Sequence, residues 1–417
     1  MEMNSAKFMT LDNGLKVLLY SDKSKSINHV ELVTFYGGNN SKYIDKNGIE
    51  KDIYHGTAHY LEHFVCERSK YGNYLTNMQK YKVLGYNAFT NNERTSYYFD
   101  TVYNFKECLK LLIDTVYSPV FNNENIDKTK YAVLNEIRDS KDDFGRNIYY
   151  RKVMNIFSNE RDVLGEKEDI EKIDYKYLED IYNTFYVPKN QLLVVAGSFD
   201  EEEIINYIKD IYSNYNFVNN KRLYLNYDKE EVVKDNDTID GSDIGELFIS
   251  YKISNRNLSS FDKYKLDWYV SYFIDINFKD ISDFNTMLKD NNIIIGDISS
   301  CMYRRNGYFV IEIFGRPNDK DKLIEMVEDR IKNIDMNSKR DFELCKKSSK
   351  TQISIRKDSI SNYILPIMDN IYAFDYYEDD TVEFVDTLNY EEYINTIKKI
   401  DFSNRSILYV KNEKIDD

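Results

Sequence analysis

The chain of 417 residues has no long apolar run, and this excludes proteins anchored by a membrane-spanning helix. No stretch approaches the roughly 18 consecutive apolar residues that such a helix needs. The first residues, MEMNSAKFMTLDNG, lack the charged-then-apolar layout of a secretory signal and the Arg-rich pattern of a presequence. With 42% apolar and 30% charged residues, we expect a soluble protein of two or three domains of about 150 residues each.

Basic residues are in deficit, which argues against proteins that bind nucleic acids. Lys and Arg number 56 against 71 Asp and Glu, a formal net charge of -15, whereas binding to phosphates needs a basic surface. The 15 glycines never form G-x-G-x-x-G, so no phosphate-binding loop of that type is expected. The acidic balance is compatible with cationic peptide substrates, although most of this charge is expected on solvated faces.

Cysteine is also scarce, and its spacing excludes a CxxC redox or zinc motif. Cys66, Cys108, Cys301 and Cys345 are far apart in the sequence. In a chain of this length they are typical of free thiols in a reducing compartment. We therefore expect a cytoplasmic protein.

The chain has only four histidines, and none follows position 63. Three lie in His55-Gly-Thr-Ala-His59-Tyr-Leu-Glu62-His63, which contains the inverted zincin arrangement H-x-x-E-H. On a helix, residues four apart share a face, so His59 and His63 can aim two imidazoles at one metal ion. Glu62 lies at the edge of that face, close enough to take a proton from a metal-bound water. A third ligand would complete a catalytic zinc site with one open position.

Hydrophobic periodicity predicts a mixture of helices and strands. Asp12-Asn13-Gly14 between two apolar runs indicates a hairpin over residues 8–20. Asp200 is placed to cap a helix that follows it. Helical spacing is present at 57–64, 105–117, 127–157, 175–186 and 201–212, and strand-like runs at 29–36, 85–92, 95–102 and 192–197.

The end of the first half recurs in the second. Residues 175–195 match residues 390–410 at an offset of 215, and each copy predicts a helix followed by a strand. We therefore predict an α+β fold of two homologous α/β sandwich halves, each an antiparallel sheet with helices packed on one side. The predicted boundaries are 1–222 for the metal-binding half, 223–241 for a charged linker, and 242–417 for a half without a metal site.

The segment from Gly56 to His63 resembles the signature of the insulinase/pitrilysin zinc metallopeptidases, the family of mitochondrial processing peptidase. Three further segments match that family in order. The resemblance covers residues 8–215 well and the remainder only loosely. The matching segments are NAFTNNERTSYY at 87–98, VLNEI at 133–137, and the stretch from Val163 to Gly197.

The resemblance implies that His59, His63 and Glu136 bind one Zn2+ per chain, with water in the fourth position. Glu62 would be the general base, and zinc would acidify the water and polarise the scissile carbonyl. The long separation between His63 and Glu136 is no obstacle, because a helix packed on the motif helix can deliver a remote carboxylate.

Some assignments stay open on the residues alone. Glu124, Asp139 or Glu166 could replace Glu136 as the third ligand. His55 is expected to precede the motif helix as a solvent-exposed or capping residue. The pair at 37–38, Gly-Gly, could line the substrate groove or simply close a turn.

The segment after position 86 is either an ordinary strand or an exposed edge to which an extended peptide adds by main-chain hydrogen bonds. The resemblance favours the edge. It therefore implies substrate-binding residues at Asn87, Ala88, Phe89, Thr90 and Asn91.

Two departures from the family pattern matter. Members often carry a second glutamate seven residues before the ligand, where this chain has Thr129, so we expect weaker zinc affinity or a substitute carboxylate. Single-chain and homodimeric members also place an arginine and a tyrosine, seven apart, in the second half. The matching stretch here has Lys289 and Gly296. We therefore expect a paralogous subunit to supply that pair in a heterodimer, and expect a homodimer less.

The sequence thus predicts a zinc endopeptidase that cleaves unfolded peptides or leader segments as the catalytic subunit of a heterodimer. The alternative is a structural or peptide-binding subunit that kept the fold and lost turnover. The zinc content of the purified chain separates these two hypotheses.

Overall fold

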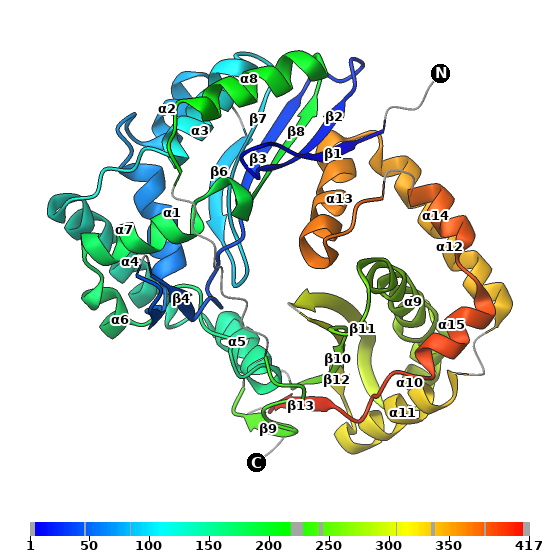
Figure 1. Cartoon of the computed structure of the whole chain (residues 1–417). Helices are drawn as coiled ribbons and strands as arrows, with labels where there is room; N and C mark the ends of the chain where they lie inside the picture. The colour runs from blue at the N-terminus through cyan, green and yellow to red at the C-terminus, as the bar shows by residue number, and fades with distance from the viewer. Residues whose placement is uncertain are drawn as a thin grey trace. The chain divides into compact units, whose positions relative to one another are not determined.

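The computed structural model describes residues 5–411 apart from 46, 84, 218–227, 242–244, 306, 335–337 and 379–380. The chain forms two compact units (Figure 1). The first unit contains residues 1–150, 159–226 and 357–368. The second contains residues 151–158, 227–356 and 369–417.

The first unit is built on a six-stranded sheet. Neighbouring strands are antiparallel, except for the parallel pair β2–β8, so the sheet is mixed and not purely antiparallel. The predicted hairpin over 8–20 is confirmed, and Gly14 in its turn has a φ of 87°. The order across the sheet is β1 (Lys7–Thr10), β2 (Lys16–Ser21), β8 (Gln191–Gly197), β3 (Asn28–Thr34), β7 (Thr95–Thr101) and β6 (Gly85–Thr90).

The stretches with helical spacing form helices. The stretch over 127–157 contains two of them, because the chain turns at 141–143 and Asp143 accepts a hydrogen bond from the Arg146 N–H at the start of the second. The side chain of Asp200 caps its helix as predicted. The elements are α1 (Thr57–Glu67), α2 (Tyr74–Lys80), α3 (Phe105–Val116), α4 (Asn123–Ser140), α5 (Phe144–Ile156), α6 (Lys167–Lys172), α7 (Tyr175–Phe185) and α8 (Glu201–Ser213), with a small sheet of β4 (Lys42–Ile44) and β5 (Glu50–Asp52).

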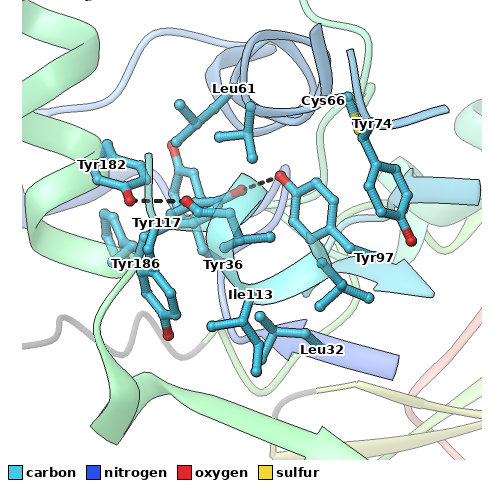
Figure 2. Packing of buried hydrophobic residues seen from close by; sticks show 14 of the residues in the cluster. Leu32, Tyr36, Leu61, Cys66, Tyr74, Tyr97, Ile113, Tyr117, Tyr182 and Tyr186 are labelled. Atoms are coloured by element: carbon cyan, nitrogen blue, oxygen red, sulfur yellow. Dashed lines mark hydrogen bonds between the residues drawn. The ribbon is translucent and has the colours of Figure 1, made fainter. Parts of the chain in front are cut away.

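Tyrosine provides much of the first core. Tyrosine rings lie among aliphatic side chains between the sheet and the helices (Figure 2). The ring of Tyr36 stacks on that of Phe185 at 4.2 Å between ring centroids. Some buried hydroxyls bond to one another or to the main chain, as those of Tyr97 and Tyr186 do at 2.9 Å. All four cysteines are free thiols.

The second unit has a five-stranded sheet, antiparallel except for the parallel pair β13–β9. The order is β11 (Ile294–Arg305), β12 (Tyr308–Pro317), β10 (Glu246–Ser254), β13 (Arg405–Val410) and β9 (Asn236–Ile239). Its helices are α9 (Ser260–Phe278), α10 (Asp283–Asp290), α11 (Lys320–Lys332), α12 (Lys339–Arg356), α14 (Thr381–Thr387) and α15 (Tyr390–Ile397), while α13 (Ile360–Phe374) divides between the units after residue 368. Across the described residues, no helix combines the length and apolar character needed to cross a membrane.

The two sheets have the same topology, which confirms the predicted homologous halves. The order β2-β8-β3-β7-β6 corresponds to β9-β13-β10-β12-β11, with the parallel pair in the same place. The predicted strand alignment is wrong by one residue. Leu193 faces the helical core as Ile407 does, an offset of 214, whereas an offset of 215 would place a residue of the opposite face there.

Strand β9 lies within the segment predicted as a linker, of which residues 223–227 are outside the described residues. The opposite face of each sheet is contacted by one helix. In the first unit Tyr20 of β2 lies 4.7 Å from Tyr363 of α13, between ring centroids. In the second unit the end of α5 packs against β12, with Val153, Ile156, Phe157, Tyr308 and Val310 in one cluster.

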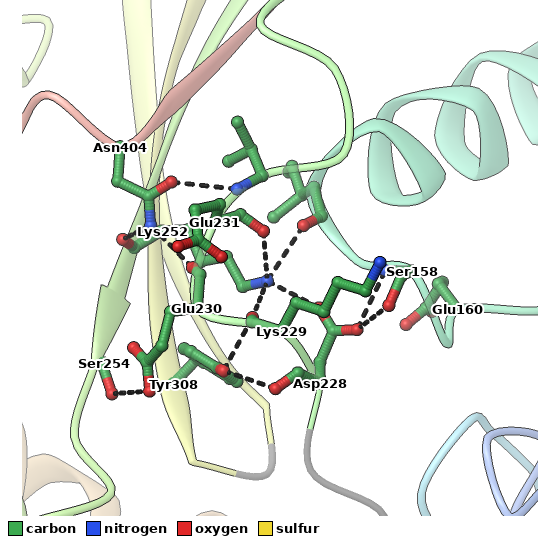
Figure 3. Close-up of polar contacts among 12 residues, drawn as sticks. Ser158, Glu160, Asp228, Lys229, Glu230, Glu231, Lys252, Ser254, Tyr308 and Asn404 are labelled. Carbon is green, nitrogen blue, oxygen red and sulfur yellow. Dashed lines mark hydrogen bonds and ion pairs between the residues drawn. The ribbon is translucent and has the colours of Figure 1, made fainter.

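A buried lysine fixes the start of the second unit. The ammonium group of Lys252 on β10 lies 2.6 Å from the Asp228 carboxylate (Figure 3). It also donates to the main-chain carbonyls of Ile156 at 3.1 Å and Lys229 at 2.7 Å. The Tyr308 hydroxyl lies 2.8 Å from two carbonyls of the same segment. The lysine therefore joins the end of α5 to the segment 228–231, which leads towards β9.

Candidate metal centre

The motif helix α1 begins after Gly56, a position where only glycine fits. Gly56 has a φ of 80°, and a Cβ there would lie 2.4 Å from the carbonyl oxygen of Leu164. The first helical residue, Thr57, donates a hydroxyl bond of 2.7 Å to the carbonyl of Tyr54. The start of the helix, and with it the direction of the histidines, is fixed by these contacts.

Three side chains converge at one point of the first unit. The Nε2 atoms of His59 and His63 are 3.1 Å apart, and Oε2 of Glu136 lies 3.4 Å from the first and 3.3 Å from the second. Zinc bonds of about 2.0–2.2 Å place the corners of a tetrahedron about 3.3–3.6 Å apart. The two distances to Glu136 lie in this range and the two nitrogens are slightly closer together, so small shifts of the side chains would place the three atoms at three corners of a tetrahedral zinc site. No other such trio occurs in the described residues.

Helix α4 delivers Glu136 because it packs directly on α1. Tyr60 of α1 donates a bond of 2.6 Å to the carbonyl of Ile126 in α4. The other carboxylates considered as ligands lie outside the trio. Glu124 pairs with Lys128, Asp139 pairs with Arg138, and Glu166 is the residue before α6.

The charges of the trio suit a metal cation. Burial and the neighbouring His63 lower the pKa of His59 to about 4, so its ring is neutral and has a free electron pair. Burial alone would lower the pKa of His63, but the carboxylates of Glu136 and Glu67 outweigh it and raise this pKa to about 10. The same bond to His63 lowers the pKa of Glu136. The contact between His63 and Glu136 lies where a metal ion would bind, so binding of the ion would displace a proton from His63.

Glu62 contacts strand β6 beside the trio. Its Oε2 accepts a bond of 3.0 Å from the Thr90 hydroxyl, and its burial raises its pKa. A carboxylate with a raised pKa beside a metal site is suited to accept and return a proton near neutral pH.

Strand β6 is the last strand of its sheet. Residues 87–90 lie in β6 and pair only with β7, while Asn91 begins the turn that follows. In the described residues, the other edge of β6 has no strand partner. This edge can accept an extended peptide.

The glycine pair at 37–38 closes a turn that supports the β6–β7 hairpin. The Gly38 N–H donates to the Asn91 carbonyl at 3.0 Å, and the Asn39 N–H donates to the Asn92 carbonyl at 2.8 Å. A Cβ on Gly37 would lie within 2.5 Å of main-chain atoms of the hairpin tip. The turn interpretation therefore accounts for both glycines.

His55 lies in the turn before α1, where its N–H donates to Asp169 at 3.0 Å, and it is not part of the trio. In the second unit, Lys289 at the end of α10 pairs with Asp297 at 2.7 Å. Gly296 lies in β11 with a φ of 77°, next to an irregularity in the strand pairing. Position 296 therefore offers no side chain and has a backbone that favours glycine.

Glu67, near the proposed metal centre, was not predicted as a functional residue from the sequence. Oε1 of Glu67 lies 3.9 Å from Nδ1 of His63, on the side of the ring away from the trio. Its spacing of four from His63 is the same helical signal that relates His63 to His59.

Two family models match the chain. Residues 49–163 match "Insulinase (Peptidase family M16)", and residues 172–349 match "Peptidase M16 inactive domain". The chain is 29% identical over 204 residues to an uncharacterized zinc protease of Bacillus subtilis, YmfH, covering 48% of this chain and 47% of that protein. It is 23% identical over 211 residues to the probable mitochondrial-processing peptidase subunit beta of Arabidopsis thaliana, covering 49% and 38%. The chain thus spans about half the length, or less, of these curated relatives.

Solved structures match nearly the whole chain. An M16-like peptidase from Alicyclobacillus acidocaldarius has a TM-score of 0.86 at 21% identity, covering 98% of this chain and 99% of that one. A protease from Helicobacter pylori has a TM-score of 0.77 at 16% identity, covering 98% and 100%. These likenesses concern the fold.

Proposed function

Since this chain belongs to the insulinase family of peptidases, peptidase family M16, we propose that it is a zinc endopeptidase that cleaves unfolded peptides or leader segments. One observation carries the proposal. His59, His63 and Glu136 present three ligand atoms at the spacing of tetrahedral zinc, and Glu62 follows His59 by three residues in the same helix.

Each residue has a distinct task in this proposal. When bound, zinc would supply a Lewis acid that acidifies a water molecule and polarises the scissile carbonyl. Glu62 accepts the proton of the attacking water and returns it to the leaving amine. The hydroxyl of Thr90 holds one oxygen of that carboxylate, which leaves the other oxygen for proton transfer.

The edge of β6 is the proposed binding place for the peptide. A peptide that adds to this edge gains main-chain hydrogen bonds without regard to its side chains, so it must be extended and locally unfolded. Thr90, the last residue of β6, contacts the proposed base Glu62, so a peptide added to this end of the strand would pass beside Glu62.

A partner subunit is proposed because of two positions in the second unit. Lys289 is engaged by Asp297, and Gly296 offers no side chain, where family members with a complete site carry arginine and tyrosine. The plant relative is itself described as a subunit beta. We therefore propose that a paralogous chain supplies the arginine and tyrosine.

The enzyme proposal is tested with the full chain and an unfolded peptide mixture, alone and with its partner. We expect one zinc per chain in the wild type and in Glu62→Gln, with cleavage only by the wild type. Cleavage by Glu62→Gln would contradict the role of the base. A wild-type chain with no affinity for zinc would instead support a structural subunit.

The partner proposal needs a separate measurement. Size-exclusion chromatography with light scattering gives the assembly state of the isolated chain, and the same fractions are assayed for cleavage. We expect little cleavage until a chain with the arginine and tyrosine is added. An isolated chain that forms a homodimer with full activity would contradict the proposal.

A further inference from the structure

The two ring nitrogens of His63 have different surroundings. Nε2 faces the trio, 3.1 Å from His59 and 3.3 Å from Glu136. Nδ1 faces Glu67, one turn further along α1, at 3.9 Å from Oε1. A histidine that binds metal through Nε2 needs an acceptor for the proton on Nδ1, and a carboxylate is a common one. Glu67 is therefore on the correct side of the ring for that task.

Glu67 is held in place by a contact between two helices. Its Oε2 lies 2.9 Å from a terminal nitrogen of Arg68. The Nε–H of Arg68 in turn donates to the hydroxyl of Thr129 on α4 at 3.3 Å. Thr129 is fully buried, which fixes the far end of this chain of contacts. Thr129 thus stands at the position of the family's second glutamate and supports a carboxylate that comes from α1 instead.

His59 has no comparable partner. Its Nδ1 is buried and has no hydrogen-bond partner within the described residues. The orientation of the metal ligands on α1 therefore depends more on the side chain behind His63 than on anything behind His59.

We propose that Glu67 is the positioning residue for His63, accepting its Nδ1–H and so directing Nε2 towards zinc, in place of the glutamate that Thr129 replaces. The inference rests on the proposed zinc site. The separation of 3.9 Å is longer than a hydrogen bond. The proposal therefore includes a small approach of Glu67 to the ring when the metal is bound.

The test measures zinc affinity of the full chain by competition with a chelator, independent of any peptidase activity. Glu67→Gln keeps the size of the side chain and removes the charge, and should weaken zinc binding about 10- to 100-fold. The zinc affinity of Glu67→Asp should lie between those of the wild type and Glu67→Gln. The matched control is Glu124→Gln, which removes the same charge from α4. Glu124 lies about 18 Å from Glu136 along the helix, so this change should leave zinc affinity unchanged.

Two further readouts separate a positioning role from a structural one. The melting temperature of the metal-free protein should be the same for Glu67→Gln and wild type, and the visible spectrum of the cobalt-substituted protein should change. Wild-type zinc affinity in Glu67→Gln, or an equal loss in Glu124→Gln, would overturn the inference. A wild type that binds no zinc would overturn the proposed function itself, and is distinguishable from both.

Discussion

The hydroxyl group of Thr90 donates a hydrogen bond of 3.0 Å to Oε2 of Glu62. Thr90 ends strand β6 and Glu62 lies on α1, so this bond joins the proposed peptide-binding edge to the proposed base. The Thr90 oxygen also lies 3.2 Å from the hydroxyl of Thr95 on the neighbouring strand. The sheet therefore orients the carboxylate on which proton transfer depends.

Replacing Thr90 by valine should lower turnover and leave zinc content unchanged. The substitution keeps the shape and removes the donor, and a hydrogen bond to a charged group contributes about 1.5–3 kcal/mol. If that contribution is lost from the transition state, kcat falls about 10- to 100-fold. Steady-state kinetics on an unfolded peptide give kcat and KM separately.

Thr90→Ser is the matched control, because it keeps the hydroxyl and should retain most of the turnover. If Thr90→Val turns over at the wild-type rate, the bond is a feature of packing and not of the reaction.

Gly37→Ala should disturb the tip of the β6–β7 hairpin. The added Cβ would lie 2.4 Å from the main-chain nitrogen of Glu93 and 2.5 Å from that of Arg94, so the main chain must shift. Overpacking of this kind costs about 1–3 kcal/mol, which a lower melting temperature would report. Peptide affinity, measured by fluorescence anisotropy with Glu62→Gln as the background, should also fall.

Gly145→Ala provides the comparison for that variant. Its Cβ would meet no atom closer than 3.5 Å, and the residue lies in α5, so it should be neutral or slightly stabilising. Equal effects of the two substitutions would refute the steric explanation.

His29 is a buried cation whose stabilising effect should depend on pH. Its Nδ1 lies 2.8 Å from Asp100 on the adjacent strand, and Nε2 lies 3.8 Å from Glu31. Burial alone would lower the pKa of His29, but the two carboxylates outweigh it and raise this pKa to about 9. The folded protein therefore holds a proton that the unfolded chain releases near pH 6.5.

Because the pKa of His29 is raised in the folded state, its protonation stabilises the fold fully below pH 6.5. This stabilisation is lost as the pH rises through about 9. The loss of stabilisation is on the order of 3 kcal/mol. Urea unfolding at pH 6, 7.5 and 9 should show a gap between wild type and His29→Gln that narrows with pH. A gap that stays constant or widens would mean that the imidazole is neutral in the folded state.

The elements that bear the proposed chemistry are those that local pattern predicts best. Helix α1 follows from its periodicity, and the hairpin β1–β2 follows from Asp12-Asn13-Gly14. Long-range pairing is different. The parallel contact of β2 with β8 joins segments about 175 residues apart, and nothing in either segment specifies its partner or direction.

The environment of the ligands also depends on contacts that spacing does not encode. Glu67 has a readable spacing from His63, but its support depends on the bond from Arg68 to Thr129, two residues that are 61 apart. Likewise, the bond from Thr90 to Glu62 depends on how α1 packs on β6. The sequence identifies the groups, and the tertiary packing decides which of them touch.

Lys252→Met should destabilise the second unit strongly. The Lys252 side chain is fully buried, burial lowers its pKa, and its removal leaves the Asp228 carboxylate buried without its cation. Breaking one half of a buried ion pair costs about 3–5 kcal/mol. Differential scanning calorimetry should therefore show a lower transition for this unit, with zinc affinity unchanged.

Two variants make that result specific. Lys252→Met combined with Asp228→Asn removes both charges and should recover part of the lost stability. Lys399→Met removes an exposed lysine from the same unit and should have little effect. A melting temperature equal to that of the wild type in Lys252→Met would show that the pair is dispensable.

Glu136→Gln should abolish the stabilisation of the chain by zinc. A ligand that binds only the folded state stabilises it by about 2.7 kcal/mol at a hundredfold excess over Kd, so zinc should raise the melting temperature of the wild type. The amide of glutamine carries no charge to balance the cation, and its oxygen would replace the carboxylate oxygen that lies 3.3–3.4 Å from the two histidines. Asp139→Asn and Glu166→Gln change the other carboxylates considered as ligands and should keep the full shift. If one of these variants loses the shift while Glu136→Gln retains it, the third ligand is that carboxylate and not Glu136.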